Sequence, residues 1–182
     1  MRLSNSRYEE IKKIVVRLFE DNDVRSTPIS GFEIATRMGI NIIPYSAFTP
    51  SKRVLAMKFS DDGFSGYEDG EWRIAYNDDP LRAYGRVNFT ILHELGHIVL
   101  KHTEDSDLAD TEADFFAKFA QCPPVLIHKL ELTDIGGIMR HFDISYGAAC
   151  YALAYYHKWL RYGGDYYKDY EIRTCQLFGF AV

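Results

Sequence analysis

The chain has 182 residues, of which 47% are hydrophobic and 15% aromatic, and this composition excludes an intrinsically disordered protein. The length predicts a single domain over residues 1–182. A formal net charge of −5, from 21 basic and 26 acidic residues without a basic block, argues against direct binding of nucleic acid.

The first eighty residues have the pattern of two helices followed by strands. A capping box at Ser6–Glu9 precedes apolar residues at helical spacing and predicts a helix over about 7–21. A second capping pattern at Ser30–Glu33 predicts a short helix that ends at Gly39. Runs rich in apolar and β-branched residues predict strands at 40–45, 53–60 and 72–77. We therefore expect a small, mostly antiparallel or mixed sheet of three to five strands.

The remainder of the chain is mainly helical in pattern. Helical spacing, proline breaks and glycine breaks predict helices at about 81–102, 110–122, 124–130, 133–141 and 145–161. A tyrosine-rich tail follows at 163–182. The whole pattern predicts an α+β domain with N-terminal helices and sheet at 1–80, a helical part at 81–162, and this C-terminal tail.

The predicted helix at 81–102 carries the chemistry of the chain. Its residues His93-Glu94-Leu95-Gly96-His97 match the pattern H-E-x-x-H. Side chains four residues apart share one helix face, so His93 and His97 can offer two imidazoles to one ion. Glu94 lies about 100° round the helix, where it can act as general base without being a ligand. This is the arrangement of a zinc hydrolase.

The surroundings of the motif support a metal site. The other side chains of this helix are mostly apolar, and burying two histidines and a glutamate among them would be unfavourable without a partner. Gly96 lowers the stability of the helix, so we expect another element to approach it closely.

A catalytic zinc needs a third protein ligand, and His102 is one alternative. It follows His93 by nine residues and points about half a turn away on a continuous helix. The extended metzincin motif fails because Leu100 and Thr103 replace its glycine and histidine. We expect His102 to be a surface residue or a partner of a ligand.

Glu112 is the stronger alternative for the third ligand. Glu112 begins a segment whose apolar residues form a stripe. If this segment is a helix packed antiparallel to the H-E-x-x-H helix, it could aim Glu112 at the two histidines. Asp114 would then lie close enough to orient a ligand histidine through its ring N–H. Asp107 and Asp110 are rivals in the preceding loop, and spacing alone leaves the choice open.

The order of motifs resembles the ImmA/IrrE family of metallopeptidases. It consists of Asn77 at the end of a strand, RVNFTILHELGH at 86–97, EADFFA at 112–117, and the proline pair 123–124. The similarity extends over roughly 29–160. One departure is Ala152, where family members often carry an arginine.

The resemblance implies a zincin-like fold, with the sheet packed on the H-E-x-x-H helix. It also implies that Zn²⁺ is held by His93, His97 and Glu112, with Glu94 as the catalytic base. Known members cleave or inactivate helix-turn-helix repressors of mobile elements or stress regulons. The expected function is thus a zinc metallo-endopeptidase acting on a separate DNA-binding repressor. The alternative is a zinc-dependent anti-repressor that displaces the repressor without cleaving it.

Two details of the reaction can be narrowed to candidates. A side chain that stabilises the oxyanion is often a Tyr, His or Arg, and the candidates in this chain are Tyr76, Tyr84, His141 and Tyr146. The substrate could pair as an extended strand with a sheet edge, for which the segment 72–77 is the candidate.

Cysteine usage and the apolar runs predict the compartment. Cys122, Cys150 and Cys175 are widely spaced and form no C-x-x-C pair, which predicts free thiols in a reducing environment. The N-terminal segment lacks the apolar core of a signal peptide, and no apolar run is long enough to cross a bilayer. We therefore expect a cytoplasmic protein without membrane contact.

Overall fold

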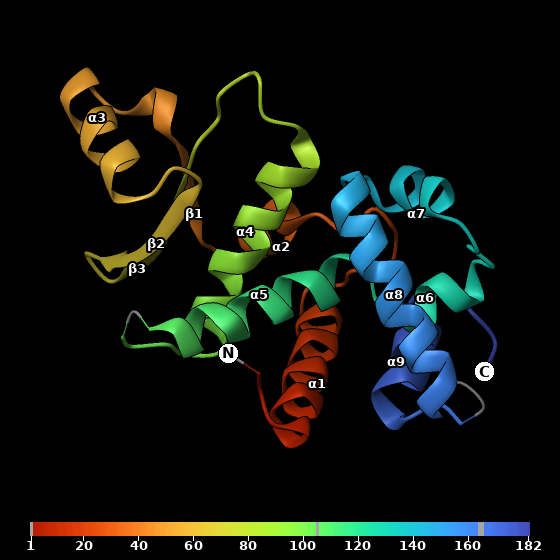
Figure 1. Cartoon of the computed structure of the whole chain (residues 1–182). Coiled ribbons are helices and arrows are strands. Elements are labelled where there is room, and N and C mark those ends of the chain that lie inside the picture. The colour runs from red at the N-terminus through yellow and green to blue at the C-terminus, as the bar shows by residue number, and fades with distance from the viewer. Residues whose placement is uncertain (1, 105, 164–165) are drawn as a thin grey trace. The chain divides into compact units, whose positions relative to one another are not determined.

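The computed structural model describes residues 2–104, 106–163 and 166–182. They form two compact units, one of Ser30–Ala117 and one of Arg2–Ile29 with Lys118–Val182. Helices predominate, and a small sheet accompanies them (Figure 1), which confirms the predicted α+β class. The prediction of one metallopeptidase domain over the whole chain stays a prediction.

The first unit contains the sheet and the H-E-x-x-H helix. Its elements are α2 (Gly31–Arg37), β1 (Asn41–Pro44), the 3-10 helix η1 (Tyr45–Ala47), α3 (Pro50–Phe59), β2 (Gly63–Glu68), β3 (Glu71–Tyr76), α4 (Tyr84–Val99) and most of α5 (Asp107–Gln121).

The sheet of the first unit is mixed, with the strand order β1-β3-β2. β1 pairs with β3 in parallel and β2 pairs with β3 antiparallel. The prediction that the segment 72–77 forms a sheet edge is wrong, because this segment is β3, which has a partner on each side. Within the described residues, the edges are β1 and β2. Strand periodicity marks a strand but does not tell which strands flank it.

The strand predicted at 53–60 is also wrong, because Pro50–Phe59 form the helix α3. Pro50 stands at the start of the helix after Thr49, which is extended, and proline suits the first helical turn because its missing N–H has no partner there. Lys, Arg, Leu, Ala and Met then fill most of the segment, and all are good helix formers. Val54 alone is β-branched.

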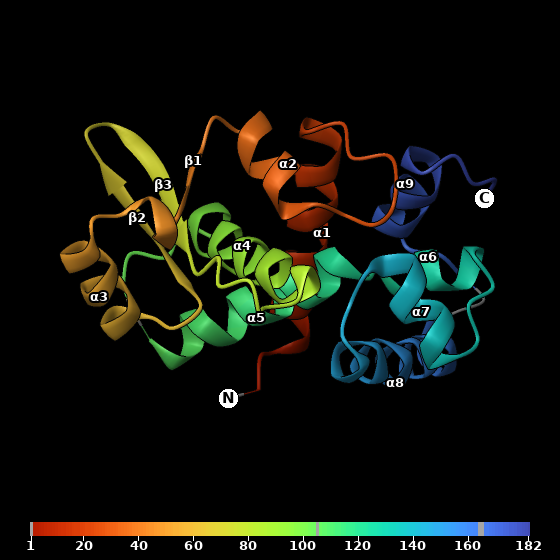
Figure 2. The same cartoon turned by 90° about the horizontal axis from the view of Figure 1, so that it is seen from above.

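The two faces of the sheet are covered by different helices. Residues alternate between faces along a strand: Ser65 is bonded to α4, and its neighbour Phe64 packs with the buried cluster of Tyr45, Ala56 and Ala75. α4 therefore covers one face, and η1 with α3 covers the other (Figure 2). This arrangement places β2 between α4 and α3.

The second unit is entirely helical within the described residues. Its elements are α1 (Asn5–Asp21), α6 (Pro124–Lys129), α7 (Ile135–Phe142), α8 (Tyr146–Gly163) and α9 (Asp169–Leu177). The segment 163–182, expected as a tail, contains α9, apart from residues 164 and 165, which lie outside the described residues. Tyr170 and Cys175 of α9 are buried.

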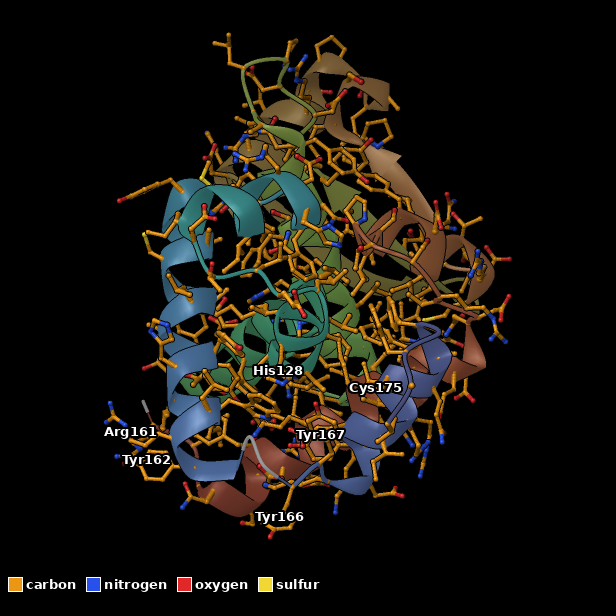
Figure 3. The ribbon with its side chains drawn as sticks, turned by 90° about the vertical axis from the view of Figure 1, so that its right-hand side faces the viewer. His128, Arg161, Tyr162, Tyr166, Tyr167 and Cys175 are labelled. Carbon is orange, nitrogen blue, oxygen red and sulfur yellow. The ribbon has the colours of Figure 1, made fainter. Side chains whose placement is uncertain are left out.

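Aromatic side chains fill the space between α6, α8 and the segment before α9. The His128 ring lies 5.4 Å from the Trp159 ring and 6.4 Å from the Tyr167 ring (Figure 3). Trp159 donates a hydrogen bond through Nε1 to the buried Glu171, which ties α8 to α9. Tyr167 and Tyr170 of the tyrosine-rich end thus pack against other helices, whereas Tyr162 and Tyr166 are exposed.

None of the helices in the described part of the chain combines the length and the apolar character that are needed to cross a bilayer.

Candidate metal centre

α4 is fixed in the first unit by its apolar face. Ile91, Leu92 and Leu95 are fully buried, whereas the side chains of His93 and His97 are 20% and 19% exposed. The spacing of these residues gives the helix one core face and one half-buried face that carries the imidazoles. Both histidines are therefore held by a rigid element and remain reachable from solvent.

Gly96 allows α5 to pack directly against α4. A Cβ at this position would lie 3.1 Å from Ala113 Cα and 3.2 Å from Phe116 Cδ1, which is closer than ordinary side-chain contacts. The close approach that the glycine predicted is confirmed. It brings the acidic start of α5 beside the two histidines.

The orientation of His93 is set by Asp114 on α5. His93 Nδ1 lies 3.1 Å from Asp114 Oδ1. An ionised carboxylate only accepts hydrogen bonds, so His93 donates through Nδ1–H. In the neutral ring the lone pair is then on Nε2. Asp114 therefore contacts His93 in the expected way, and its role as the partner of a metal ligand stays a prediction.

The orientation of His97 is set by a chain of two further side chains. Glu112 Oε2 lies 3.1 Å from His102 Nε2, and His102 Nδ1 lies 3.0 Å from His97 Nδ1. The carboxylate requires the proton of His102 on Nε2, so in neutral His102 Nδ1 is an acceptor. His97 then donates through Nδ1–H and keeps its lone pair on Nε2. His102 is thus a partner of His97, one of the two roles expected for it.

The two Nε2 atoms that carry these lone pairs lie close together. His93 Nε2 and His97 Nε2 are 3.1 Å apart, and Asp110 Oδ1 lies 4.0 Å and 3.4 Å from them respectively. Three electron-rich atoms so close together repel one another unless a proton or a metal cation lies among them. Two imidazole nitrogens and a carboxylate oxygen form a ligand set that suits zinc and related divalent ions. The residues therefore fit a metal ion.

The charges around the centre also favour a cation. Burial lowers the pKa of His93, but the hydrogen bond to Asp114 and the charges of Glu94, Asp114 and Asp110 outweigh it, so the pKa lies above its ordinary value. Surroundings that attract a proton to an imidazole also attract a metal cation.

The carboxylate beside the histidines is Asp110, one of the predicted rivals of Glu112. Within the described residues, the group that could hold a metal consists of His93, His97 and Asp110. Glu112 is buried on α5 and bonds to His102. Asp107, the other rival, is exposed. The role of Glu112 as a metal ligand stays a prediction.

Glu94 is held at the centre by the sheet. Ser65 Oγ on β2 donates a 2.8 Å hydrogen bond to Glu94 Oε2, and only 8% of Glu94 is exposed. Burial raises the pKa of Glu94 more than Ser65 and His93 lower it. A carboxylate with a raised pKa is a better proton acceptor than a fully solvated one.

Ser65 was not found by sequence reasoning. It lies 29 residues before Glu94 and belongs to no motif. Its strand, β2, is not among the strands predicted from the sequence, and the register of β2 against β3 is needed to put Ser65 on the face that meets α4.

The four candidates for stabilising an oxyanion are divided between the two units. Tyr76 and Tyr84 lie in the first unit, where both rings pack against Phe32. His141 and Tyr146 lie in the second unit. The assignment of this role stays a prediction.

A comparison with protein families agrees with this geometry. Residues 35–154, more than half of the chain, match the family model of the IrrE N-terminal-like domain, Peptidase_M78. The chain belongs to this family. The match confirms the resemblance to ImmA/IrrE proteins that the motifs indicate, and it includes the group on α4 and α5 that could hold a metal. Membership in the M78 family implies a peptidase-like function that is typically metal-dependent. No curated protein matches the chain significantly.

Proposed function

We propose that this M78-family protein is a zinc-dependent metallo-endopeptidase that hydrolyses a peptide bond in a helix-turn-helix repressor. The observation that carries the proposal is the convergence of His93 Nε2, His97 Nε2 and Asp110 Oδ1, with the buried Glu94 adjacent on the same helix. Two oriented imidazoles with an adjacent carboxylate base are the donor set that metal-assisted hydrolysis requires.

His93, His97 and a carboxylate of α5 would hold the zinc. The structure favours Asp110 as this carboxylate, and the family resemblance favours Glu112. When bound, zinc supplies a Lewis acid that polarises the peptide carbonyl and makes a water more acidic. Asp114 and the His102–Glu112 pair hold the two imidazoles in the tautomer that turns Nε2 towards the ion.

Glu94 would move the proton. The hydrogen bond from Ser65 to Oε2 fixes its carboxylate, which would accept the proton of the attacking water. Glu94 then passes this proton to the leaving amine. Because Glu94 is not in the metal-binding group, its amide variant should keep the metal and lose the reaction.

The substrate side of the proposal rests on the sheet edge and on the family. β2 pairs with β3 alone among the described strands, and an extended segment of substrate could pair with its other edge. Such a segment must come from a flexible loop or linker of the repressor. The three cysteines are free, which supports a reducing compartment, and we expect the reaction to occur in the cytoplasm.

Co-expression with a helix-turn-helix repressor from the same genome tests the proposal. The repressor's intact mass is measured with the wild type, with Glu94→Gln and with Glu33→Gln, which changes an exposed glutamate on α2. A defined cut with the wild type and Glu33→Gln, absent with Glu94→Gln, is the expected result. An intact repressor that loses DNA binding equally with all three forms would instead identify an anti-repressor that acts without cleavage.

A further inference from the structure

α3 exposes several large apolar side chains. Of its apolar residues, Val54 is 56% exposed, Leu55 65% and Phe59 74%, whereas Ala56 is the buried contact to the sheet. Leu55 and Phe59 are four residues apart and share one face of the helix. Exposed apolar side chains grouped on one element mark an interaction surface more often than scattered ones do.

The same helix carries positive charge. Lys52, Arg53 and Lys58 are exposed, and α3 contains no acidic residue, although the whole chain has a net charge of −5. The acids that follow α3 do not neutralise it, because Asp61 and Asp62 form ion pairs with Arg82 and Arg86. Asp78 is the acid whose charge interacts with Arg53. The exposed surface of α3 is therefore both apolar and basic.

This surface reaches β2, an edge strand of the sheet, although α3 and Glu94 lie on opposite faces of that sheet. The Phe59 ring lies 5.0 Å from the ring of Phe64 on β2. The next residue of β2, Ser65, bonds to Glu94. A protein chain bound along α3 would thus reach β2 within a few residues, since an extended chain spans about 3.3 Å per residue.

We propose that α3 is a docking helix for the protein substrate, and that it binds an acidic segment with apolar side chains outside the bond that is cleaved. The proposal rests on the proposed peptidase function. The basic residues of α3 favour an acidic partner by charge complementarity. The apolar side chains favour a protein segment over a nucleic acid, because a phosphate backbone offers them no apolar contact. Among protein partners, the contact of α3 with the edge strand β2 favours the substrate.

Two variants separate the apolar and the electrostatic contributions. The double variant Val54→Gln, Leu55→Gln removes exposed apolar surface, and glutamine is itself a good helix former, so α3 should be retained. The double variant Lys52→Glu, Lys58→Glu reverses two positive charges of α3. Tyr162→Gln is the matched control, because Tyr162 is a 75% exposed aromatic residue in the second unit. Each change is made in wild type and in the Glu94→Gln background, in which binding is measured without cleavage.

The expected result is a rise in the Kd for the intact repressor of about tenfold or more for both α3 variants, with no change for the control. KM for the repressor should rise with kcat nearly unchanged, and cleavage of a short peptide spanning the scissile bond should be unaffected. Unchanged Kd and KM would overturn the proposal. A second result would also overturn it: the α3 variants bind the repressor as the wild type does but no longer bind vesicles of equal phosphatidylglycerol and phosphatidylcholine. That result would assign α3 to a membrane surface.

The two proposals fail in different ways. If the wild type does not cleave the repressor, but the α3 variants still weaken its binding, the peptidase proposal is wrong and the docking helix remains. If cleavage occurs and the α3 variants bind and cleave like the control, the docking proposal alone is wrong.

Discussion

Replacement of Asp114 tests how the chain orients its imidazoles. Asp114→Ala removes the acceptor of the hydrogen bond from His93 Nδ1, so the ring is no longer held with its lone pair on Nε2. Loss of such a partner typically weakens metal binding about 10- to 100-fold, which corresponds to about 1.4–2.7 kcal/mol. Asp114→Asn can still accept this bond through its amide oxygen and should lose less affinity.

The assay is zinc affinity by competition with a chromophoric chelator, supported by thermal unfolding. At a zinc concentration about 100 times the wild-type Kd, bound zinc stabilises the fold by about 2.7 kcal/mol, and a tenfold weaker site reduces this to about 1.4 kcal/mol. Asp107→Ala, which removes an exposed acid from the same helix, is the control. Equal affinities for Asp114→Ala and Asp107→Ala would refute the account of tautomer control.

Three further predictions concern β2 and its surroundings. Ser65→Ala should lower kcat by about tenfold with little change in KM, because the hydrogen bond that holds the Glu94 carboxylate in place is lost. Ser65→Thr should restore most of the activity, and a change confined to KM would contradict this positioning role. Gly63→Ala should lower the free energy of unfolding by about 1–3 kcal/mol, because the new Cβ would lie 2.8 Å from a backbone oxygen of β3. Gly66→Ala is the control, because its Cβ would meet nothing within 4 Å. Equal urea midpoints for the two variants would show that the reasoning is wrong. Burial raises the pKa of Asp62, but hydrogen bonds and charges of Arg86 and Arg82 outweigh burial and hold this pKa below its ordinary value. Ionised Asp62 therefore stabilises the fold at any pH above the ordinary pKa, and this contribution is lost as the pH falls through the pKa of the folded state. Asp62→Asn should therefore flatten the acid side of the stability profile measured by urea unfolding, and an unchanged slope there would argue against the ion pairs.

The predictions that succeeded rest on local periodicity. The H-E-x-x-H spacing placed His93 and His97 on one face of a helix, and Gly96 predicted a close neighbour, because both features depend on a few residues of one element. Asp114 was found for the same reason, since it lies on a second, strongly patterned helix.

The predictions that failed have two different causes. The strand expected at 53–60 overlooks a local signal, because Pro50 starts a helix there. The expected edge at 72–77 is a central strand because β1 pairs beside β3, and this contact between distant segments leaves no local signal. The same limit applies to the third carboxylate. Asp110 and Glu112 are two residues apart on α5, and only the rotation of α5 against α4 decides which of them meets His93 and His97 and which meets His102.

Diffraction from zinc-soaked crystals at the zinc absorption edge tests the central claim most directly. The account predicts one anomalous peak bonded to His93 Nε2 and His97 Nε2 at about 2.0–2.1 Å, with a carboxylate oxygen of α5 as a further ligand. The same map would decide between Asp110 and Glu112. A peak bonded to other residues, or none at saturating zinc, would contradict the assignment of this site as a metal centre.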